Sequence, residues 1–293
     1  MTGRRHVSLA LFLSAAFVAV GAQPPRPGGR LNRLIDRLEQ KRPAMGTVNR
    51  QAPRSLEAAR ALAVRDLDFA VFDVESGVTD LAQFETSLQA LRDPAVLRGR
   101  RPISPIVRIP RAQNDAPDAI VRSMLDLGVF GIMFGHIDTR EQAERAVAAV
   151  RVPADDMMGG PGAAAAYWGL AARAYADRAE VWPLVRRGEL VAIMMIESPE
   201  AVRNAAEIAQ VPGVAALFFG PGDFGRATGK PSRLPLVAPE TETAIHAMLA
   251  ACRAHRVACG YPVAGSPAAL QPETEKRLAQ GFRIVTQVDL GRF

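Results

Sequence analysis

The feature that most constrains the fold is a regular alternation of short apolar runs with longer amphipathic stretches. Eight runs have the length and the β-rich composition of buried strands. The stretches between them carry apolar residues at helical spacing, and some begin with a capping pair such as Ser198 and Pro199. The expected strands are residues 44–49, 69–75, 104–109, 131–137, 191–197, 214–220, 257–261 and 283–288. The expected helices are residues 55–65, 80–92, 116–128, 139–151, 163–180, 198–210, 240–256 and 266–281.

Strands that are almost wholly apolar and alternate with helices are typical of a parallel sheet covered by helices. Eight such repeats favour an α/β fold of the (β/α)8 TIM-barrel type, and a doubly wound open sheet is the alternative. Leu31, Leu34, Ile35 and Leu38 recur at helical spacing before the first strand, which predicts an N-terminal lead-in helix within residues 31–43.

The first residues have the pattern of a signal peptide. Arg4 and Arg5 precede an apolar stretch from Val7 to Val20, which is shorter than the ~20 residues that span a bilayer. Cleavage after Ala22 is expected, and a retained N-terminal anchor is the alternative. The expected organisation is a signal peptide at 1–22, a linker at 23–30 and one barrel domain at 31–293, in a protein that is exported to the periplasm or secreted.

Charge and cysteine content narrow the function classes. The formal net charge is +6, and removal of residues 1–22, with two arginines and no acids, leaves +4. The arginines are spread along the chain, so neither nucleic-acid binding nor, after signal cleavage, membrane binding is expected. Cys252 and Cys259 would lie on a helix and the following strand, where a disulfide and two core thiols both fit.

Polar residues stand at the C-terminal ends of the expected strands, and in a barrel these ends meet at one mouth. Glu197 ends the run MMIE, and a Gly-Pro-Gly turn in FFGPGDFG delivers Asp223. Two carboxylates suit Mg²⁺ or Mn²⁺, and a pair of solvated acids is the alternative. Arg108 ends an apolar strand, and its planar fork suits a substrate carboxylate. The strand-end residues are Asp73, Glu75, Ser76, Arg108, His136, Glu197 and Asp223.

Four motifs that carry these residues follow one another along the chain: FDVESGVTD, VRIPRAQ, LDLGVFGIMFGHIDTREQAERAVAAVRVP and MMIESPEAVRNAAEIAQVPGVAALFFGPGDFGRATG. Together they resemble the HpcH/HpaI aldolase/citrate lyase family, from about Leu31 to the C-terminus. The first is similar to an acid-x-Glu-His segment of that family, and the second to the strand with its carboxylate-binding arginine. The third resembles its helix-strand-helix stretch, and the fourth resembles its paired-acid signature.

The resemblance implies a barrel enzyme that uses a divalent metal, Mg²⁺ or Mn²⁺, to cleave or form a C–C bond beside a pyruvate-type carbonyl. It implies Glu197 and Asp223 as metal ligands and Arg108 as the residue that binds the carboxylate of a small 2-keto acid. The substrate pocket would be lined by the backbone of Gly220, Pro221 and Gly222. The resemblance also implies a homo-oligomer, often a hexamer, with the lead-in and C-terminal helices as candidate contacts.

Independently of the family resemblance, the positions of the lysines exclude the Schiff-base mechanism of other aldolases. A Schiff-base aldolase needs a lysine inside the barrel. The chain contains only Lys41, Lys230 and Lys276, and none of them lies in an expected strand.

Two segments depart from the family pattern. Ser76 stands where the aldolases have a histidine, and a serine without an activating base does not abstract protons. We hypothesise that His136 assumes part of this proton transfer, and a hydrogen-bonded structural imidazole is the alternative. Asp73, Ser76, Arg108 and His136 are therefore the candidate catalytic residues. Met158 replaces a family arginine, and residues 152–162 are expected to form a loop over the barrel mouth.

The sequence predicts an exported, metal-dependent carbon–carbon lyase of the aldolase type that acts on a small 2-keto acid. One alternative is a protein that keeps the fold and binds a metal and a small carboxylate without turnover. Another is a citrate-lyase-like acyl lyase that acts on thioesters, although thioester cofactors are not expected outside the cytoplasm.

Overall fold

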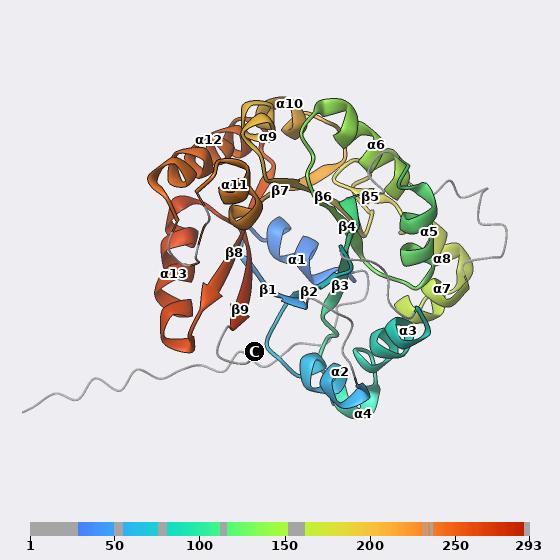
Figure 1. Cartoon of the computed structure of the whole chain (residues 1–293). Coiled ribbons are helices and arrows are strands. Elements are labelled where there is room, and N and C mark those ends of the chain that lie inside the picture. The colour runs from blue at the N-terminus through green and yellow to red at the C-terminus, as the bar shows by residue number, and fades with distance from the viewer. Residues whose placement is uncertain are drawn as a thin grey trace, which may run out of the picture.

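A computed structural model shows a closed barrel of parallel strands surrounded by helices (Figure 1). The structure describes residues 29–49, 55–75, 81–111, 116–151, 162–230, 232, 234 and 237–289. Within them the barrel strands are β1 (Ala44–Asn49), β2 (Phe69–Asp73), β3 (Ser104–Ile109), β4 (Gly131–Phe134), β6 (Leu190–Ile196), β7 (Val214–Phe219), β8 (Ala258–Gly265) and β9 (Ile284–Asp289).

Each barrel strand pairs in parallel with its neighbours in the order β1, β2, β3, β4, β6, β7, β8, β9, and β9 pairs again with β1. The pairing of β4 with β6 closes the ring, while the short β5 (Val181–Trp182) adds to the side of β6. The predicted (β/α)8 barrel is therefore confirmed, and the open doubly wound sheet is excluded.

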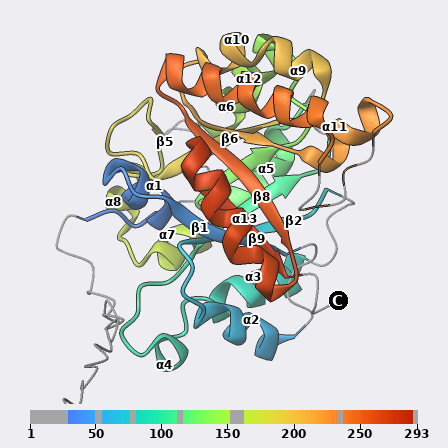
Figure 2. The same ribbon diagram turned by 90° about the vertical axis from the view of Figure 1, so that its left-hand side faces the viewer.

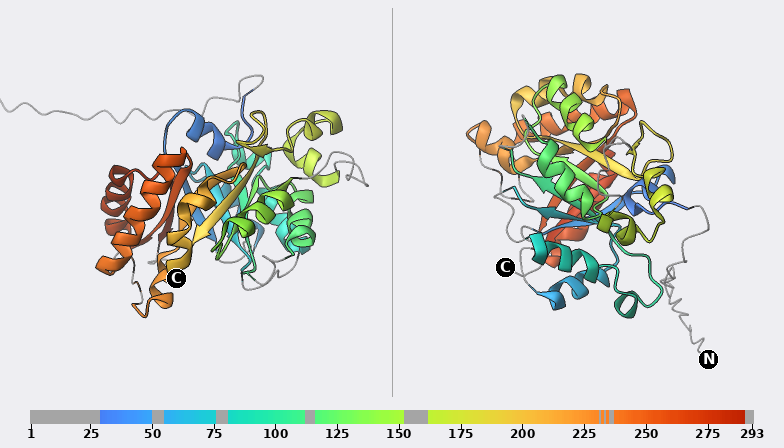
Figure 3. Two further views of the ribbon diagram at one scale, coloured as in Figure 1. Left: turned by 90° about the horizontal axis from the view of Figure 1, so that it is seen from above. Right: turned by 90° about the vertical axis from the view of Figure 1, so that its right-hand side faces the viewer.

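Helices form the outer layer, as Figures 2 and 3 show from three further sides. The longest, α12 (Pro239–His255) and α13 (Pro267–Gln280), follow β7 and β8. The others are α2 (Leu56–Ala63), α3 (Leu81–Ala90), α4 (Pro94–Leu97), α5 (Asp118–Asp126), α6 (Arg140–Val150), α7 (Gly162–Trp168), α8 (Ala172–Ala176), α9 (Pro199–Arg203), α10 (Ala205–Ala209) and α11 (Pro221–Ala227).

The strands bury both faces, which explains their nearly continuous apolar sequence. Side chains such as Phe69, Ile106 and Phe218 fill the barrel interior, whereas alternate residues such as Phe72 and Phe219 pack beneath the helices. Since neighbouring side chains of a strand point to opposite faces, each run supplies both cores at once.

The predicted lead-in helix is α1 (Arg33–Glu39), and it closes the N-terminal end of the barrel. Leu34 and Ile35 are fully buried in the interior cluster. The amide of Asn32 donates to the carbonyl of Glu189, and the Arg33 backbone N–H donates to Ser104 Oγ, both at strand beginnings. Figure 1 shows α1 across the middle of the ring. Because this end is filled, only the opposite end of the barrel can admit a ligand.

Several element boundaries differ from the sequence predictions. The strand expected at 131–137 ends at Phe134, since the backbone turns out of the sheet and His136 has φ +54°. The helix expected at 163–180 is split into α7 and α8 at Gly169, which has φ +67°, and the one at 198–210 is split at Asn204. The short elements α4 and β5 were not predicted because four residues or fewer carry no readable periodicity.

The expected Gly-Pro-Gly turn before Asp223 is wrong. Gly220 is instead the N-cap of α11, and Pro221 occupies its first position. Proline is favoured there because its fixed φ suits a helix and its missing N–H would have no helical partner. Asp223 therefore projects from a helical turn that directly follows β7.

Cys252 at the end of α12 and Cys259 in β8 form a disulfide, which settles the alternative that the sequence left open. Residues 1–22 and most of the expected linker lie outside the described residues, as does almost all of the loop at 152–162. Among the residues that the structure does describe, no helix has the length and apolar character of a membrane span.

Candidate active site at the C-terminal mouth of the barrel

An arginine and an aspartate face each other where β2 and β3 end. The strand register places Asp73 beside Arg108, and Arg108 Nε donates to Asp73 Oδ1 at 2.9 Å while Nη2 donates to Oδ2. Arg108 Nη2 also lies 2.9 Å from Glu75 Oε2. Burial alone would lower the pKa of Arg108, but the hydrogen bond and charge of Asp73 more than offset this effect and raise it. Arg108 is thus a fixed cation at the mouth.

Arg108 retains one free edge. Its Nη1 meets only the sulfur of Met195, at 3.8 Å, among the described residues. Asp73 and Glu75 hold the other nitrogens, so the guanidinium is oriented before any ligand arrives. A carboxylate that approaches Nη1 would find a charged donor whose position is already set.

His136 lies at the centre of three carboxylates from different strand ends. Its Nε2 is 3.7 Å from Glu197 Oε2, 3.8 Å from Glu75 Oε1 and 3.9 Å from Asp223 Oδ1. These separations exceed hydrogen-bond length. The left-handed backbone at His136 also turns its N–H toward Glu197 Oε2, to which it donates at 2.9 Å. Burial holds the pKa of the imidazole below its ordinary value, which favours the neutral form near pH 7.

Glu197 is the most unusual group in the site. Its side chain is only 1% exposed, and its Oε1 has no hydrogen-bond partner among the described residues. Burial, followed by repulsion from Asp223, raises its pKa to about 8. A buried, charged carboxylate with one oxygen unpaired is costly, so its retention in the mouth indicates that something else compensates the charge.

Gly220 makes room for this carboxylate. A Cβ at position 220 would lie 2.3 Å from Glu197 Oε1, closer than any non-bonded contact permits. The residue between β7 and α11 must therefore lack a side chain. The backbone at Gly220 consequently approaches the acid, as expected of a segment that lines a pocket.

The donors fit a divalent cation. Glu75, His136 and Glu197 each offer a ligand atom within 4.8 Å of the others. Two ligands of one cation with bonds of about 2.1 Å lie roughly 3 to 4 Å apart, close to the separations seen around His136. The unpartnered Glu197 Oε1 is the atom that a cation would satisfy. Asp223 borders the same group, although its carboxylate also accepts a hydrogen bond from the exposed Arg226.

The structure brings most of the sequence-predicted site residues to one end of the barrel. Figure 3 (left) shows α1, in blue, and the orange segment with α11 at opposite ends of the molecule. Ser76 falls outside the described residues, so its expected place is not described. The mouth holds Asp73, Arg108, His136, Glu197, Gly220, Pro221, Gly222 and Asp223.

Glu75 is a residue of the site to which the sequence pattern assigns no role. It stands at an expected strand end, and in the structure it lies against both Arg108 and His136. A signal was available in the sequence, since the expected strand 69–75 includes both Asp73 and Glu75 and side chains alternate along a strand. Two acids at this spacing point to the same side.

Comparisons with known proteins identify the family of the chain. A family model described as HpcH/HpaI aldolase/citrate lyase matches residues 53–282. A 5-keto-4-deoxy-D-glucarate aldolase of Shigella dysenteriae is 27% identical over 238 residues, 80% of this chain and 83% of the relative. A hydroxypyruvate/pyruvate aldolase of Chromohalobacter salexigens is 34% identical over 174 residues, 59% of this chain and 61% of the relative.

Solved structures give the same result for the fold. A crystal structure of an HpcH/HpaI aldolase/citrate lyase family protein from Burkholderia cenocepacia J2315 superposes with a TM-score of 0.68. It shares 27% sequence identity, and the match covers 89% of this chain and 94% of that one. The similarity therefore extends over nearly the whole of both chains.

Proposed function

Because the chain belongs to the HpcH/HpaI aldolase/citrate lyase family, we propose that it is a divalent-metal-dependent carbon–carbon lyase of the aldolase type. Its substrate would be a small 2-keto acid, in which it cleaves or forms the bond next to a pyruvate-type enolate. Relatives named as aldolases support this assignment. The observation that carries it is the buried Glu197 beside His136, whose Oε1 has no hydrogen-bond partner among the described residues.

Glu197 and Asp223 would hold the metal, Mg²⁺ or Mn²⁺, with Glu75 and His136 beside them. When bound, such an ion supplies a Lewis acid that withdraws electrons from the substrate carbonyl and stabilises the enolate. The raised pKa of Glu197 means that the side chain gives up a proton when the cation enters. Metal affinity should therefore increase with pH below about 8.

Arg108 would bind the carboxylate of the 2-keto acid. Asp73 and Glu75 fix its orientation and leave the edge near Met195 for the ligand. A hydrogen bond from Nη1 at this edge would direct the neighbouring carbonyl toward the acidic cluster. The backbone of Gly220, Pro221 and Gly222 would form the adjoining wall, where Gly220 permits close approach.

His136 would move the proton in cleavage. For a 4-hydroxy-2-keto acid, a base takes the hydroxyl proton as the C3–C4 bond breaks, which releases an aldehyde and leaves the electron pair on the enolate. The enolate then receives a proton at C3. The lowered pKa leaves His136 neutral and able to accept the first proton near pH 7. The surrounding carboxylates would stabilise the imidazolium that forms.

The test is metal-dependent pyruvate release. Purified protein is mixed with Mg²⁺ or Mn²⁺ and candidate 4-hydroxy-2-keto acids, and pyruvate is followed by a coupled assay before and after chelation. Release that stops with the chelator supports the proposal. Metal-dependent binding without release would favour a binding protein, and turnover of thioesters alone would favour an acyl lyase.

The proposal extends to location and assembly. The pattern at 1–22 and the Cys252–Cys259 disulfide support a mature protein in an oxidising compartment outside the cytoplasm. A homo-oligomer, such as a hexamer, is proposed from the resemblance. The apolar face of α1 lies against its own barrel and would not supply the subunit contact. Detection of the mature protein in the periplasmic or secreted fraction and its mass by light scattering are the tests.

A further inference from the structure

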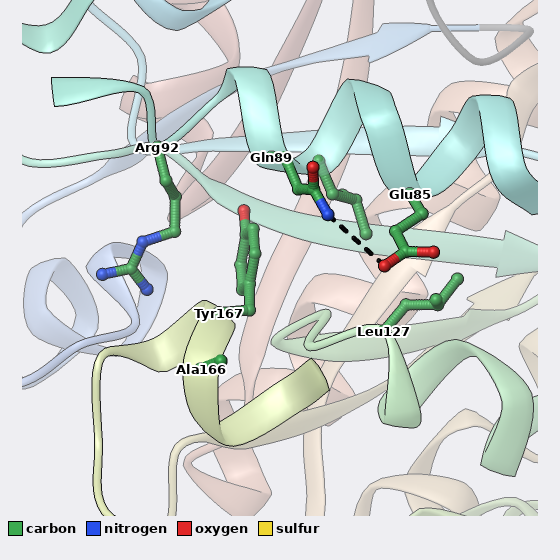
Figure 4. A pocket seen from close by; sticks show the side chains of 7 residues that line it. Glu85, Gln89, Arg92, Leu127, Ala166 and Tyr167 are labelled. Atoms are coloured by element: carbon green, nitrogen blue, oxygen red, sulfur yellow. Dashed lines mark hydrogen bonds between the residues drawn. The ribbon is translucent and has the colours of Figure 1, made fainter. Parts of the chain in front are cut away.

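A second pocket lies outside the barrel, in the helical layer between α3, α5 and α7 (Figure 4). Its volume is about 340 Å³, which is within the range of small-molecule sites. It contains no residue of the barrel mouth. The residues that line it are Glu85, Leu88, Gln89, Arg92, Leu127, Ala166 and Tyr167.

Arg92, at one end of this pocket, has no acidic ion-pair partner among the described residues. It lies two residues after α3, and its Cζ is 5.1 Å from the centre of the Tyr167 ring. Among the described residues, the guanidinium of Arg92 has no hydrogen bond and no ion pair, in contrast to those of Arg108 and Arg277. Burial lowers its pKa, but a guanidinium stays charged at neutral pH. Its N–H donors are therefore available to a ligand.

Tyr167 supplies a second unused donor. Its hydroxyl is buried and has no hydrogen-bond partner in the described part of the chain. Burial also raises its pKa, so the group remains a neutral O–H donor. Leaving such a group unpaired is unfavourable, and a ligand oxygen would satisfy it.

The Tyr167 ring is held in place by its neighbours. Gly128 has φ +93°, and a Cβ there would lie 2.7 Å from the tyrosine side chain. Trp168 Nε1 donates to the Gly128 carbonyl at 2.9 Å, which fixes α7 against the end of α5. The Tyr167 donor is thus positioned by packing before any ligand binds.

The other end of the pocket limits the charge of a ligand. Gln89 Nε2 donates to Glu85 Oε1 at 3.3 Å, and Figure 4 shows Glu85 on the far side of Tyr167 from Arg92. This acid would repel a second negative charge. Leu127 and Ala166 provide apolar surface beside it. One cation, one neutral donor and an apolar wall suit an anion with a single charge and an apolar body.

We propose that this pocket binds a small monocarboxylate. Its carboxylate would accept hydrogen bonds from the Arg92 guanidinium and the Tyr167 hydroxyl, and its apolar part would lie against Leu127 and Ala166. The ligand is either the same class of keto acid as in the barrel mouth or an unrelated apolar acid. The site is independent of the proposed lyase activity, which neither requires it nor depends on its outcome.

The test measures carboxylate binding by isothermal titration calorimetry in the full mature protein. An Arg108→Gln background removes the carboxylate contact of the mouth. Pyruvate, benzoate and phosphate are the probes. The expected result is one carboxylate per chain, weakened at least about 10-fold by Arg92→Gln, as loss of a charged partner predicts, with phosphate binding more weakly.

Tyr167→Phe keeps the ring and its packing, so it tests the site without a loss of folding. It should weaken binding about 3- to 10-fold. Arg98→Gln, which removes an exposed arginine from the nearby α4 end, should leave binding unchanged. If pyruvate binds more tightly than benzoate, the ligand of the pocket belongs to the keto-acid class. If benzoate binds more tightly, the ligand is an unrelated apolar acid.

The proposal is overturned if the Arg108→Gln protein binds neither carboxylate, or if Arg92→Gln and Tyr167→Phe both bind them as tightly as their parent. Pyruvate release by the protein with an intact Arg108 separates these outcomes from a failure of the lyase assignment. An enzyme that turns over but shows no second site would refute the pocket alone.

Discussion

Both ends of the barrel contain buried carboxylates, but the hydrogen bonding of these carboxylates differs between the two ends. At the N-terminal end, Asp68 is 3% exposed and accepts hydrogen bonds from Arg33 Nη2, Arg37 Nε and the Met45 backbone N–H, at 2.9 to 3.0 Å. Both oxygens of Glu189 are likewise paired, in part with the backbone N–H groups of Leu31 and Asn32 just before α1. At the C-terminal mouth, Glu197 has one oxygen without any partner among the described residues.

This difference distinguishes carboxylates that stabilise the fold from a carboxylate that serves the candidate site. A buried acid whose oxygens are all engaged stabilises one arrangement of the chain, and its partners account for its presence. A buried acid that faces other acids raises the free energy of the empty site. Such a group is useful only when a cation binds, so the contrast distinguishes the sealed end from the reactive end.

The largest expected effect is at Glu197. Glu197→Gln should lower kcat/KM for pyruvate release by about 1,000-fold and abolish Mn²⁺ binding, because a neutral amide is a poor ligand for a hard cation. The free energy of unfolding of the metal-free protein should not fall. The measurements are the coupled pyruvate assay, calorimetry with Mn²⁺ and urea unfolding. Glu200→Gln, an exposed acid in α9, is the matched control. Normal turnover in Glu197→Gln would contradict a functional role for Glu197, and with it the contrast between the two ends of the barrel.

Asp68 should show the opposite behaviour. Asp68→Asn is expected to lower the free energy of unfolding by about 3 kcal/mol, because it leaves Arg33 and Arg37 without their common carboxylate. Metal affinity should change little in the protein that remains folded. Urea unfolding measures the loss. Asp177→Asn, which breaks the exposed pair with Arg187, should cost less than about 1 kcal/mol. Equal losses in both variants would contradict a structural role for Asp68.

His136 gives an intermediate effect. His136→Ala should lower kcat about 100-fold and leave Mn²⁺ affinity within a few-fold, since a general base contributes to the chemical step. Steady-state kinetics and calorimetry separate these quantities. An unchanged kcat would show that the imidazole is structural, and a parallel loss of metal affinity would make it a ligand instead.

The smallest effect, taken over a single pH unit, is a dependence of stability on pH. The pKa of Glu197 is about 8 in the folded protein against an ordinary value of 4.5. Between these values the folded state binds one more proton than the unfolded state, so the free energy of unfolding decreases as pH rises, by at most about 1.4 kcal/mol per unit. Urea unfolding of metal-free wild type and Glu197→Gln from pH 5 to 8 should show this slope in wild type only. Parallel curves would mean that the carboxylate is compensated in the folded protein.

Much of the fold could be predicted because it depends on local patterns. The eight apolar runs became the eight barrel strands within a few residues of their expected bounds, and Leu34 and Ile35 marked the lead-in helix. The errors fall where a local pattern is too short or the backbone leaves its regular region. The helix α11, read as a turn, and the left-handed His136 are examples.

The candidate site was predictable in position but not in its contacts. Strand-end polar residues and the barrel rule placed Arg108, Glu197 and Asp223 at one mouth. The sequence could not show that Asp73 engages the guanidinium of Arg108, or that Glu75 reaches both Arg108 and His136. Those contacts depend on side-chain directions set by the register of neighbouring strands.

By itself, the sequence determined the strand and helix pattern, the family resemblance, the exclusion of an imine mechanism and the pair of carboxylates. The tertiary structure decided which end of the barrel is closed, that Cys252 and Cys259 are joined, and that Glu197 Oε1 has no partner among the described residues. It also placed Arg92 beside Tyr167, which are 75 positions apart in the chain. Periodicity is a property of neighbouring residues, whereas burial and charge balance depend on segments that meet only when the ring of strands closes.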